Sequence, residues 1–171
     1  KARAYMPFRM LPGMGLGELK RAVDERTHYA GERLKAGFVK MFMDGVLEST
    51  TAYMLDDYGG HPGLRGEPLF TPQDFDAICI EVDRLGLQIA VHAIGDAAVR
   101  QTLDGYAAAR RANGGRDSRH RIEHIETLDP ADLRLAEQIG RLHEVKAHVV
   151  VDGDEAAHHR EAHEEEAGQT R

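Results

Sequence analysis

Short apolar runs alternate along this chain with segments whose apolar residues recur every three or four positions. Phe75, Ile78, Cys79 and Val82 follow the i, i+3, i+4, i+7 spacing of a helix with one buried face. The apolar run 87–92 is short and stops at a polar group, which indicates a strand. The pattern predicts strands over residues 4–10, 38–43, 87–92, 121–124 and 145–151, and helices over residues 16–29, 72–85, 97–110 and 129–140.

Turn and capping residues indicate where these elements begin and end. Thr71 supplies a hydroxyl N-cap and Pro72 suits the first helical position, so the helix is expected to begin there. Asp96 is interpreted as the N-cap of the helix over 97–110. Residues 45–70 contain many Gly, Pro and Asp residues, which predicts a long loop.

The alternation of strands and helices predicts an α/β fold in which helices cover a parallel sheet. His92 and His124 are 32 residues apart. A strand–helix unit of an eight-unit barrel of about 250 residues has roughly 31 residues. We therefore expect a partial (β/α)8 TIM barrel with parallel strands and outer helices. The strands over 38–43, 87–92 and 121–124 should be neighbours in that order, with the helices over 72–85 and 97–110 on the same outer side.

The last twenty residues differ in composition from the rest. From Asp152 to Arg171 there is no Leu, Ile, Val, Met or aromatic residue, and the histidines are His158, His159 and His163. Such a segment cannot bury enough apolar surface to order itself, so we expect disorder or a solvated helix. The predicted organisation is a barrel segment over 1–151 followed by a polar, acidic, His-containing tail over 152–171.

Composition excludes several classes of function. The formal net charge is −7, from 22 basic and 29 acidic residues, and no basic stripe marks a nucleic-acid surface. No apolar run is long enough to span a bilayer, and the N-terminus lacks the layout of a signal peptide. The single cysteine, Cys79, excludes an intramolecular disulfide, is expected in the core, and suits a reducing compartment such as the cytoplasm.

Polar residues at the strand ends are the candidate functional residues, because barrel enzymes have their active sites there. His92 and His124 end two successive predicted strands, and Lys40 lies within a third. Imidazole and carboxylate groups suit divalent metals, although a single histidine at a strand end is more often structural. Lys40 shares its strand face with Phe38 and Phe42, so it must snorkel, pair with an acid such as Asp44, or be chemically altered.

Three blocks in this order resemble the metal-dependent amidohydrolase superfamily. They run from Val39 to Gly45 with Thr51-Ala52 downstream, from Val91 to Ala98, and from His120 to His124. The most similar branch is amidohydrolase family 3, which includes N-substituted formamide deformylases. The resemblance covers roughly residues 1–140.

The resemblance implies a metal site at the carboxyl ends of the strands. Enzymes of this family are (β/α)8 barrels with one or two divalent metals, zinc foremost and manganese or iron as alternatives. Carried over to this sequence, the metal ligands are Lys40 as a carbamate, His92 and His124. Asp44, Asp96 and Glu123 follow or flank them as supporting residues.

Two features of the family pattern have no match in this sequence. No two histidines are separated by one residue, so the His-x-His pair of the first strand is absent. The aspartate of the last strand, a ligand and proton shuttle in the family, has no evident match either, and the catalytic residue is unassigned. The chain is therefore interpreted as the middle of a barrel, and its exposed sheet edges predict self-association.

Two functions remain open at this point. The first is a metal-dependent hydrolase that acts on small molecules with amide-like C–N or ester bonds, of which this chain is an incomplete and by itself inactive piece. The second is a non-catalytic α/β module that retains half of a metal or partner site.

Overall fold

A four-stranded parallel sheet forms the centre of the computed structural model, which describes residues 4–139. The strands lie in chain order β1-β2-β3-β4, and each neighbouring pair is parallel. Their bounds are Ala4–Arg9 for β1, Leu34–Phe42 for β2, Gln88–Ala93 for β3 and Arg121–His124 for β4. The predicted order and direction of the strands are confirmed.

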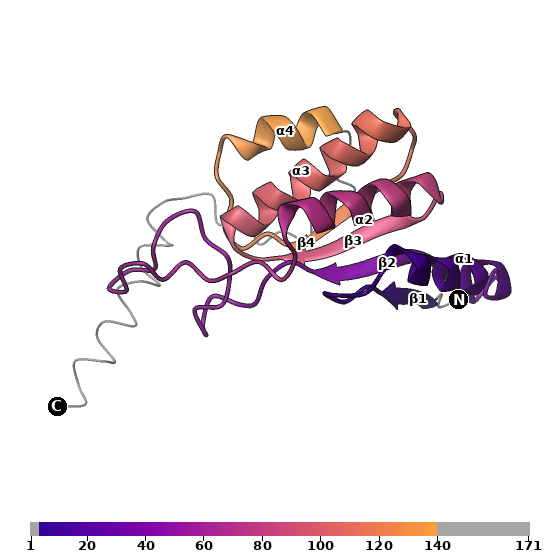
Figure 1. Ribbon diagram of the computed structural model, residues 1–171, viewed down its shortest axis with the longest axis horizontal. Helices are drawn as coiled ribbons and strands as arrows, with labels where there is room; N and C mark the ends of the chain where they lie inside the picture. The colour runs from indigo at the N-terminus through magenta and orange to yellow at the C-terminus, as the bar shows by residue number, and fades with distance from the viewer. Residues whose placement is uncertain (1–3, 140–171) are drawn as a thin grey trace.

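The helices cover one face of this sheet. A 3-10 turn, Leu16–Glu18, leads into α1, Leu19–His28, which packs against β2. Figure 1 shows α2, α3 and α4 together on one side of the strands. Their bounds are Pro72–Arg84, Asp96–Asn113 and Asp132–Ile139. Helices on one side of a parallel sheet are the arrangement of a barrel wall.

Strand parity separates an apolar face from a polar face. Val39, Met41, Ile89, Val91 and Ile122 are buried in one core cluster together with residues of α1, α2 and α3. Cys79 lies in the same cluster and is fully buried, as expected. The opposite face, which is the inner face of a barrel, carries the alternate residues Lys40, Phe42, Gln88, His92, Arg121 and Glu123.

Most predicted boundaries agree with the structure to within a few residues. The Thr71 hydroxyl accepts the amide N–H of Asp74, so the predicted N-cap of α2 is confirmed. Strand β2 begins four residues earlier than predicted, at Leu34, because it pairs with β1 there. The predicted strand over 145–151 and the tail over 152–171 lie outside the described residues.

The interpretation of Asp96 as the N-cap of α3 is wrong. Gly95 is the N-cap, and Asp96 is the first residue of the helix. Its carboxylate instead accepts the amide N–H of Leu55, at 2.8 Å, and thereby joins the long loop to the start of the helix.

Among residues 4–139, no helix is long and apolar enough to cross a membrane.

Close packing between α2 and α3 gives a first prediction. A methyl group at Gly105 would lie 2.5 Å from a ring carbon of Phe75, which is fully buried. We expect Gly105→Ala to lower the free energy of unfolding, at the upper end of the roughly 1–3 kcal/mol that overpacking costs. This loss exceeds the ~1 kcal/mol that alanine gains over glycine in a helix.

Urea denaturation measures this effect. Gly17→Ala is the matched control, because no atom of residues 4–139 lies within 4 Å of the added carbon there. Equal stability of the two variants would contradict the tight contact between the helices.

Candidate functional site

The three residues predicted as metal ligands lie towards the carboxyl ends of β2, β3 and β4, and two of them, His92 and His124, are in contact. His92 lies in β3, and its ring meets the ring of His124 edge-on, with 4.6 Å between the ring centroids. Lys40 lies in β2, and its ammonium is 4.9 Å from the ring centroid of Phe42, which in turn contacts His92. The parallel register aligns the strand ends, since Phe42 pairs with His92 and Ala93 pairs with His124. Strand alternation alone would place His124 on the face of Ala93, opposite His92, but the positive φ of His124 breaks the alternation and its ring meets the ring of His92.

A hydrogen bond indicates the tautomer of the neutral His92 ring. Its Nε2 lies 2.9 Å from the carbonyl oxygen of Gly45. Because a carbonyl can only accept, Nε2 carries the proton, and in the neutral ring Nδ1 keeps its lone pair. The side chain is buried, so this contact orients the ring as well.

One of the predictions for Lys40 was an ion pair with Asp44. In the structure Lys40 pairs with Glu123 instead. The ammonium of Lys40 contacts Oε2 of Glu123 across the inner face of the sheet. Arg121 donates to the other carboxylate oxygen of Glu123 at 3.1 Å. Burial alone would raise the pKa of Glu123, but the two cations outweigh it and hold that pKa below its usual value. Glu123 is therefore ionised between two cations.

Asp44 is a buried carboxylate that binds backbone amides. Strand β2 ends at Phe42, so Asp44 lies beyond the alternation that would place it beside Lys40. Its two oxygens accept the N–H groups of Tyr53, Ile94 and Gly95, at 2.8–3.1 Å. Burial raises its pKa, although these three donors oppose the rise. Asp44 thus joins the end of β2 to the long loop and to the start of α3.

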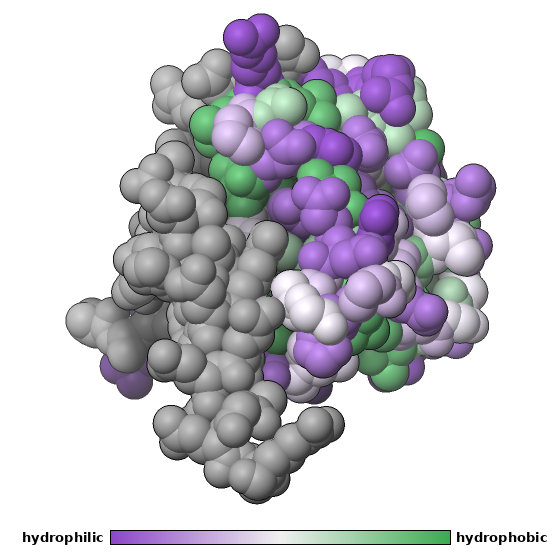
Figure 2. Space-filling view, turned by 90° about the vertical axis from the view of Figure 1, so that its left-hand side faces the viewer, coloured by the Kyte–Doolittle hydropathy of each residue, from purple (hydrophilic) through white to green (hydrophobic). Residues whose placement is uncertain are grey.

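The long loop lies over the carboxyl ends of the strands, at the left of Figure 1. Figure 2 looks at this end of the molecule, and the coloured surface there is mainly polar with apolar patches between. Besides the bonds to Asp44 and Asp96, the amide of Ala98 donates to the carbonyl of Tyr53 at 3.2 Å. The predicted loop is therefore tied to the site at several points.

The chain leaves β4 through an unusual backbone conformation. His124 and Ile125 have φ values of 83° and 50°, a region that β-branched residues such as isoleucine rarely adopt. Ile125 is buried, and its amide donates to the carbonyl of Ala93 at 3.0 Å, which holds the conformation in place. Conformations of this kind concentrate at functional sites.

The side chains at this end of the sheet supply some, but not all, of the ligands that a divalent metal needs. Burial lowers the pKa of His124, and the neighbouring His92 and Lys40 lower it further, so the ring is neutral and can donate a lone pair. Lys40 fits only after carboxylation, since an ammonium has no lone pair. Within residues 4–139, no three His, Cys, Asp or Glu side chains form a metal-binding group.

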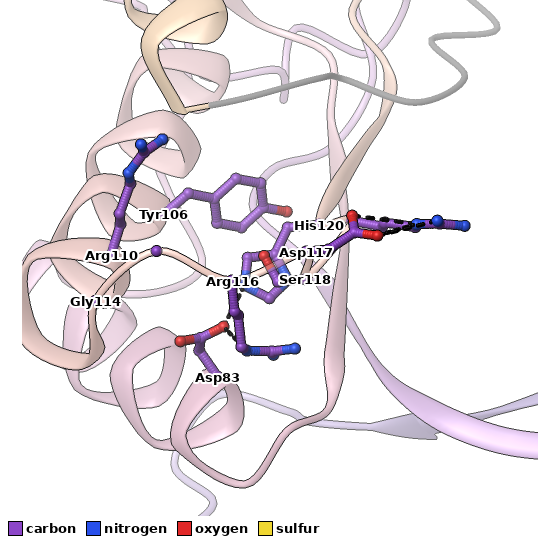
Figure 3. Close-up of a pocket in the computed structure, with 10 residues that line it drawn as sticks. Asp83, Tyr106, Arg110, Gly114, Arg116, Asp117, Ser118 and His120 are labelled. Carbon is purple, nitrogen blue, oxygen red and sulfur yellow. Dashed lines mark hydrogen bonds and ion pairs between the residues drawn. The ribbon is translucent and has the colours of Figure 1, made fainter.

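A cavity of about 500 Å³ lies at the opposite end of the sheet, near the start of β4. Figure 3 shows Asp83, Arg116 and His120 grouped at its wall. Asp83 is buried and accepts from Arg116 at 2.7 Å and from Asn113 at 3.0 Å. This cluster was not predicted from the sequence, because its members are far apart in the chain, with Asp83 in α2 and Arg116 and His120 in the segment before β4.

His120 is a neutral histidine within that cluster. The amide of Ile89 donates to its Nδ1 at 3.1 Å, so the proton is on Nε2, which lies 3.1 Å from Asp83 Oδ1. Burial lowers the pKa of His120 to about 4, since the effect of Asp83 in the opposite direction is smaller. The cluster connects α2, β3 and β4 and is distinct from the site at the carboxyl ends.

Comparison with known proteins shows the family of this chain. A family model described as "Amidohydrolase family" matches residues 1–167. The match continues past residue 140, where the resemblance was expected to end, so that limit was wrong.

Individual relatives are all much longer than this chain. Protein LONG AFTER FAR-RED 3 of Arabidopsis thaliana is 38% identical over 130 residues, 74% of this chain and 22% of that protein. N-substituted formamide deformylase of Arthrobacter pascens is 28% identical over 91 residues, 53% of this chain and 16% of that protein. The crystal structure of an uncharacterized metal-dependent hydrolase from Pyrococcus furiosus matches with a TM-score of 0.60 at 30% identity, covering 72% of this chain and 25% of that one. The chain thus spans a quarter or less of each.

The lowered pKa of His120 predicts a dependence of stability on pH. Below about pH 6.5 the ring takes up a proton in the unfolded chain, whereas the folded ring does so only near pH 4. The unfolded state then binds more protons, so the free energy of unfolding falls as the pH falls. This residue should contribute a loss of up to about 3 kcal/mol between pH 7 and pH 4.

Urea denaturation across this pH range tests the expectation. The dependence should be shallower in His120→Gln than in the control His61→Gln, whose side chain is exposed. Identical slopes in both variants would show that His120 is not held neutral by the fold.

Proposed function

The chain belongs to the amidohydrolase family, and on this basis we propose that it is the metal-binding middle segment of a hydrolase barrel. The observation that carries the proposal is the contact of His92 with His124 at the carboxyl ends of adjacent parallel strands, with Lys40 on the neighbouring strand β2. Active sites of (β/α)8 barrels are built at that end. The structural likeness to a metal-dependent hydrolase supports the same assignment.

His92 and His124 are the residues proposed to hold a divalent metal, together with Lys40 as a carbamate. Carboxylation would join the neutral amine of Lys40 to carbon dioxide through a new N–C bond, with release of one proton. Glu123 would release Lys40 in this process and keep Arg121 as its partner. A divalent metal supplies Lewis acidity towards a substrate carbonyl and makes water more acidic.

The residues of this chain would bind and orient the groups of the site. Because Nε2 of His92 is engaged by Gly45, we assign Nδ1 as the nitrogen that faces a metal. Asp44 and Asp96 hold the loop that covers the site through its backbone amides. We propose a small-molecule substrate with an amide-like or ester bond, with zinc the foremost metal and manganese or iron as alternatives.

Both edge strands of the described sheet are relevant to this proposal. Within residues 4–139, β1 and β4 each pair on one side only. We propose that the remaining strands of a barrel, or a second copy of the chain, pair with these edges. The whole protein would act in the cytoplasm, where the buried, unpaired Cys79 stays reduced.

Zinc binding by the chain tests the assignment of the ligands. The partial ligand set should bind Zn²⁺ weakly, because a closed site needs further donors. The binding should be lost in His92→Ala/His124→Ala and retained in His28→Ala/His61→Ala. Equilibrium dialysis should be carried out after His158, His159 and His163 are changed to glutamine, which removes binding by those residues.

Two results would change this view. Equal binding in the double variant and its control would remove His92 and His124 from the site. Tight stoichiometric binding that disappears only in the double variant would show that the chain supplies a complete site by itself.

Activity separates the enzyme from a non-catalytic module. Residues 1–171 alone should show no enzyme-like hydrolysis of N-formyl, N-acyl or ester substrates, with or without added metal. A longer chain that carries the remaining strands should be active with zinc, manganese or iron. Lys40→Ala should reduce that activity by more than the roughly 10–100-fold that loss of a ligand-orienting residue costs.

Glu81→Gln is the control for that measurement, because Glu81 pairs with Arg84 on the exposed side of α2. A longer chain that binds metal but hydrolyses none of these substrates would favour the non-catalytic module.

A further inference from the structure

The peptide unit between Gly45 and Val46 is held at both of its ends. Its carbonyl accepts the Nε2–H of His92 at 2.9 Å. Its amide N–H donates to the side-chain oxygen of Thr51 at 3.0 Å. Because a peptide unit is planar, fixing the N–H end also fixes the direction of the C=O end. Thr51 therefore determines where the carbonyl that faces His92 points.

The other hydrogen bonds of the surrounding turn hold the neighbouring peptide units and, among the described residues, do not involve the Gly45 carbonyl or the Val46 amide. The amide of Gly45 donates to the carbonyl of Thr51, and the amide of Thr51 donates to the carbonyl of Val46, both at 3.1 Å. Thr51 also packs directly on Gly45, where an added methyl carbon would lie 2.0 Å from the threonine oxygen. Glycine permits this close approach, and it also permits the peptide to rotate once the hydroxyl contact is removed.

We propose that Thr51 is a positioning residue that acts through the Gly45 carbonyl to set the tautomer of His92. With the carbonyl in place, the proton of the neutral ring is on Nε2, and Nδ1 presents its lone pair to the site. Without it, Asp44 Oδ1 is another acceptor on the Nε2 side, but at 3.7 Å it lies beyond hydrogen-bond distance. The fraction of the Nδ1–H form therefore rises and the ring loses its orientation. The inference rests on the proposed function only in taking His92 as a ligand.

The tautomer is measured directly in the metal-free chain. Nitrogen NMR of the full chain with ¹⁵N-labelled histidine, at a pH where imidazole is neutral, distinguishes the two ring nitrogens. The His92 signals are identified by their absence in His92→Gln. We expect the Nε2–H form in the unchanged chain and in Thr51→Ser, which keeps the hydroxyl. We expect a mixture of tautomers in Thr51→Val, which keeps the shape of the side chain without the hydroxyl.

Two further variants keep the test decisive. Ser49→Ala removes the other hydroxyl bonded to Thr51, at 2.8 Å, without touching the Val46 amide, and should leave the tautomer unchanged. If Thr51→Val does not fold, Thr51→Ala removes the hydroxyl with a smaller side chain and should show the same mixture. A folded variant without the hydroxyl that keeps the pure Nε2–H form would overturn the proposal.

Zinc affinity provides a second readout. We expect it to fall about tenfold in Thr51→Val and to recover in Thr51→Ser, the size of effect typical of ligand-orienting residues. The tautomer measurement involves no metal. A change of tautomer without metal binding in any variant would therefore refute the proposed metal site and leave the role of Thr51 intact. If the tautomer is unchanged in every variant but zinc binding requires His92, the role of Thr51 is refuted and the proposed metal site stands.

Discussion

Asp44 is a buried carboxylate that three backbone amides hold in the interior, with Nε2 of His92 3.7 Å from its Oδ1. Burying a carboxylate is costly unless such donors replace water. The donors come from the loop after β2 and from the turn before α3, so these segments must meet around it. The meeting brings Gly45 against His92 and Tyr53 against the first turn of α3. The arrangement of the carboxyl end of the sheet thus follows from satisfying one buried charge.

Local sequence signals located most of the fold because they act over a few residues. The spacing of Phe75, Ile78, Cys79 and Val82 identified the buried face of α2, and Thr71 identified its beginning. Asp96 was assigned to the wrong role for the same reason: an aspartate before a helix usually caps it, whereas its partner here, Leu55, is 41 residues away. Local chemistry says which group is available but does not say which distant segment will approach it.

The candidate site shows the same limit. Positions at or near strand ends and the order of the blocks predicted Lys40, His92 and His124 at one end of the sheet, and the ring contact in the structure agrees for the two histidines. Parity also put Asp44 on the face of Lys40, but the strand ends before it, and Glu123 from β4 reaches the lysine instead. Thr51 was part of the motif that carried the resemblance, yet nothing in the sequence shows that its hydroxyl meets the amide of Val46.

The sheet order has a consequence for how such a chain folds during its synthesis. Within residues 4–139, each strand after β1 pairs with the one made just before it, so each meets a partner that has already left the ribosome. Pairing of this kind closes loops between successive elements and avoids waiting for distant parts of the chain. The last strand made exposes its free edge until the next arrives. A sheet built in this order can stop growing at any strand without undoing the pairs already formed.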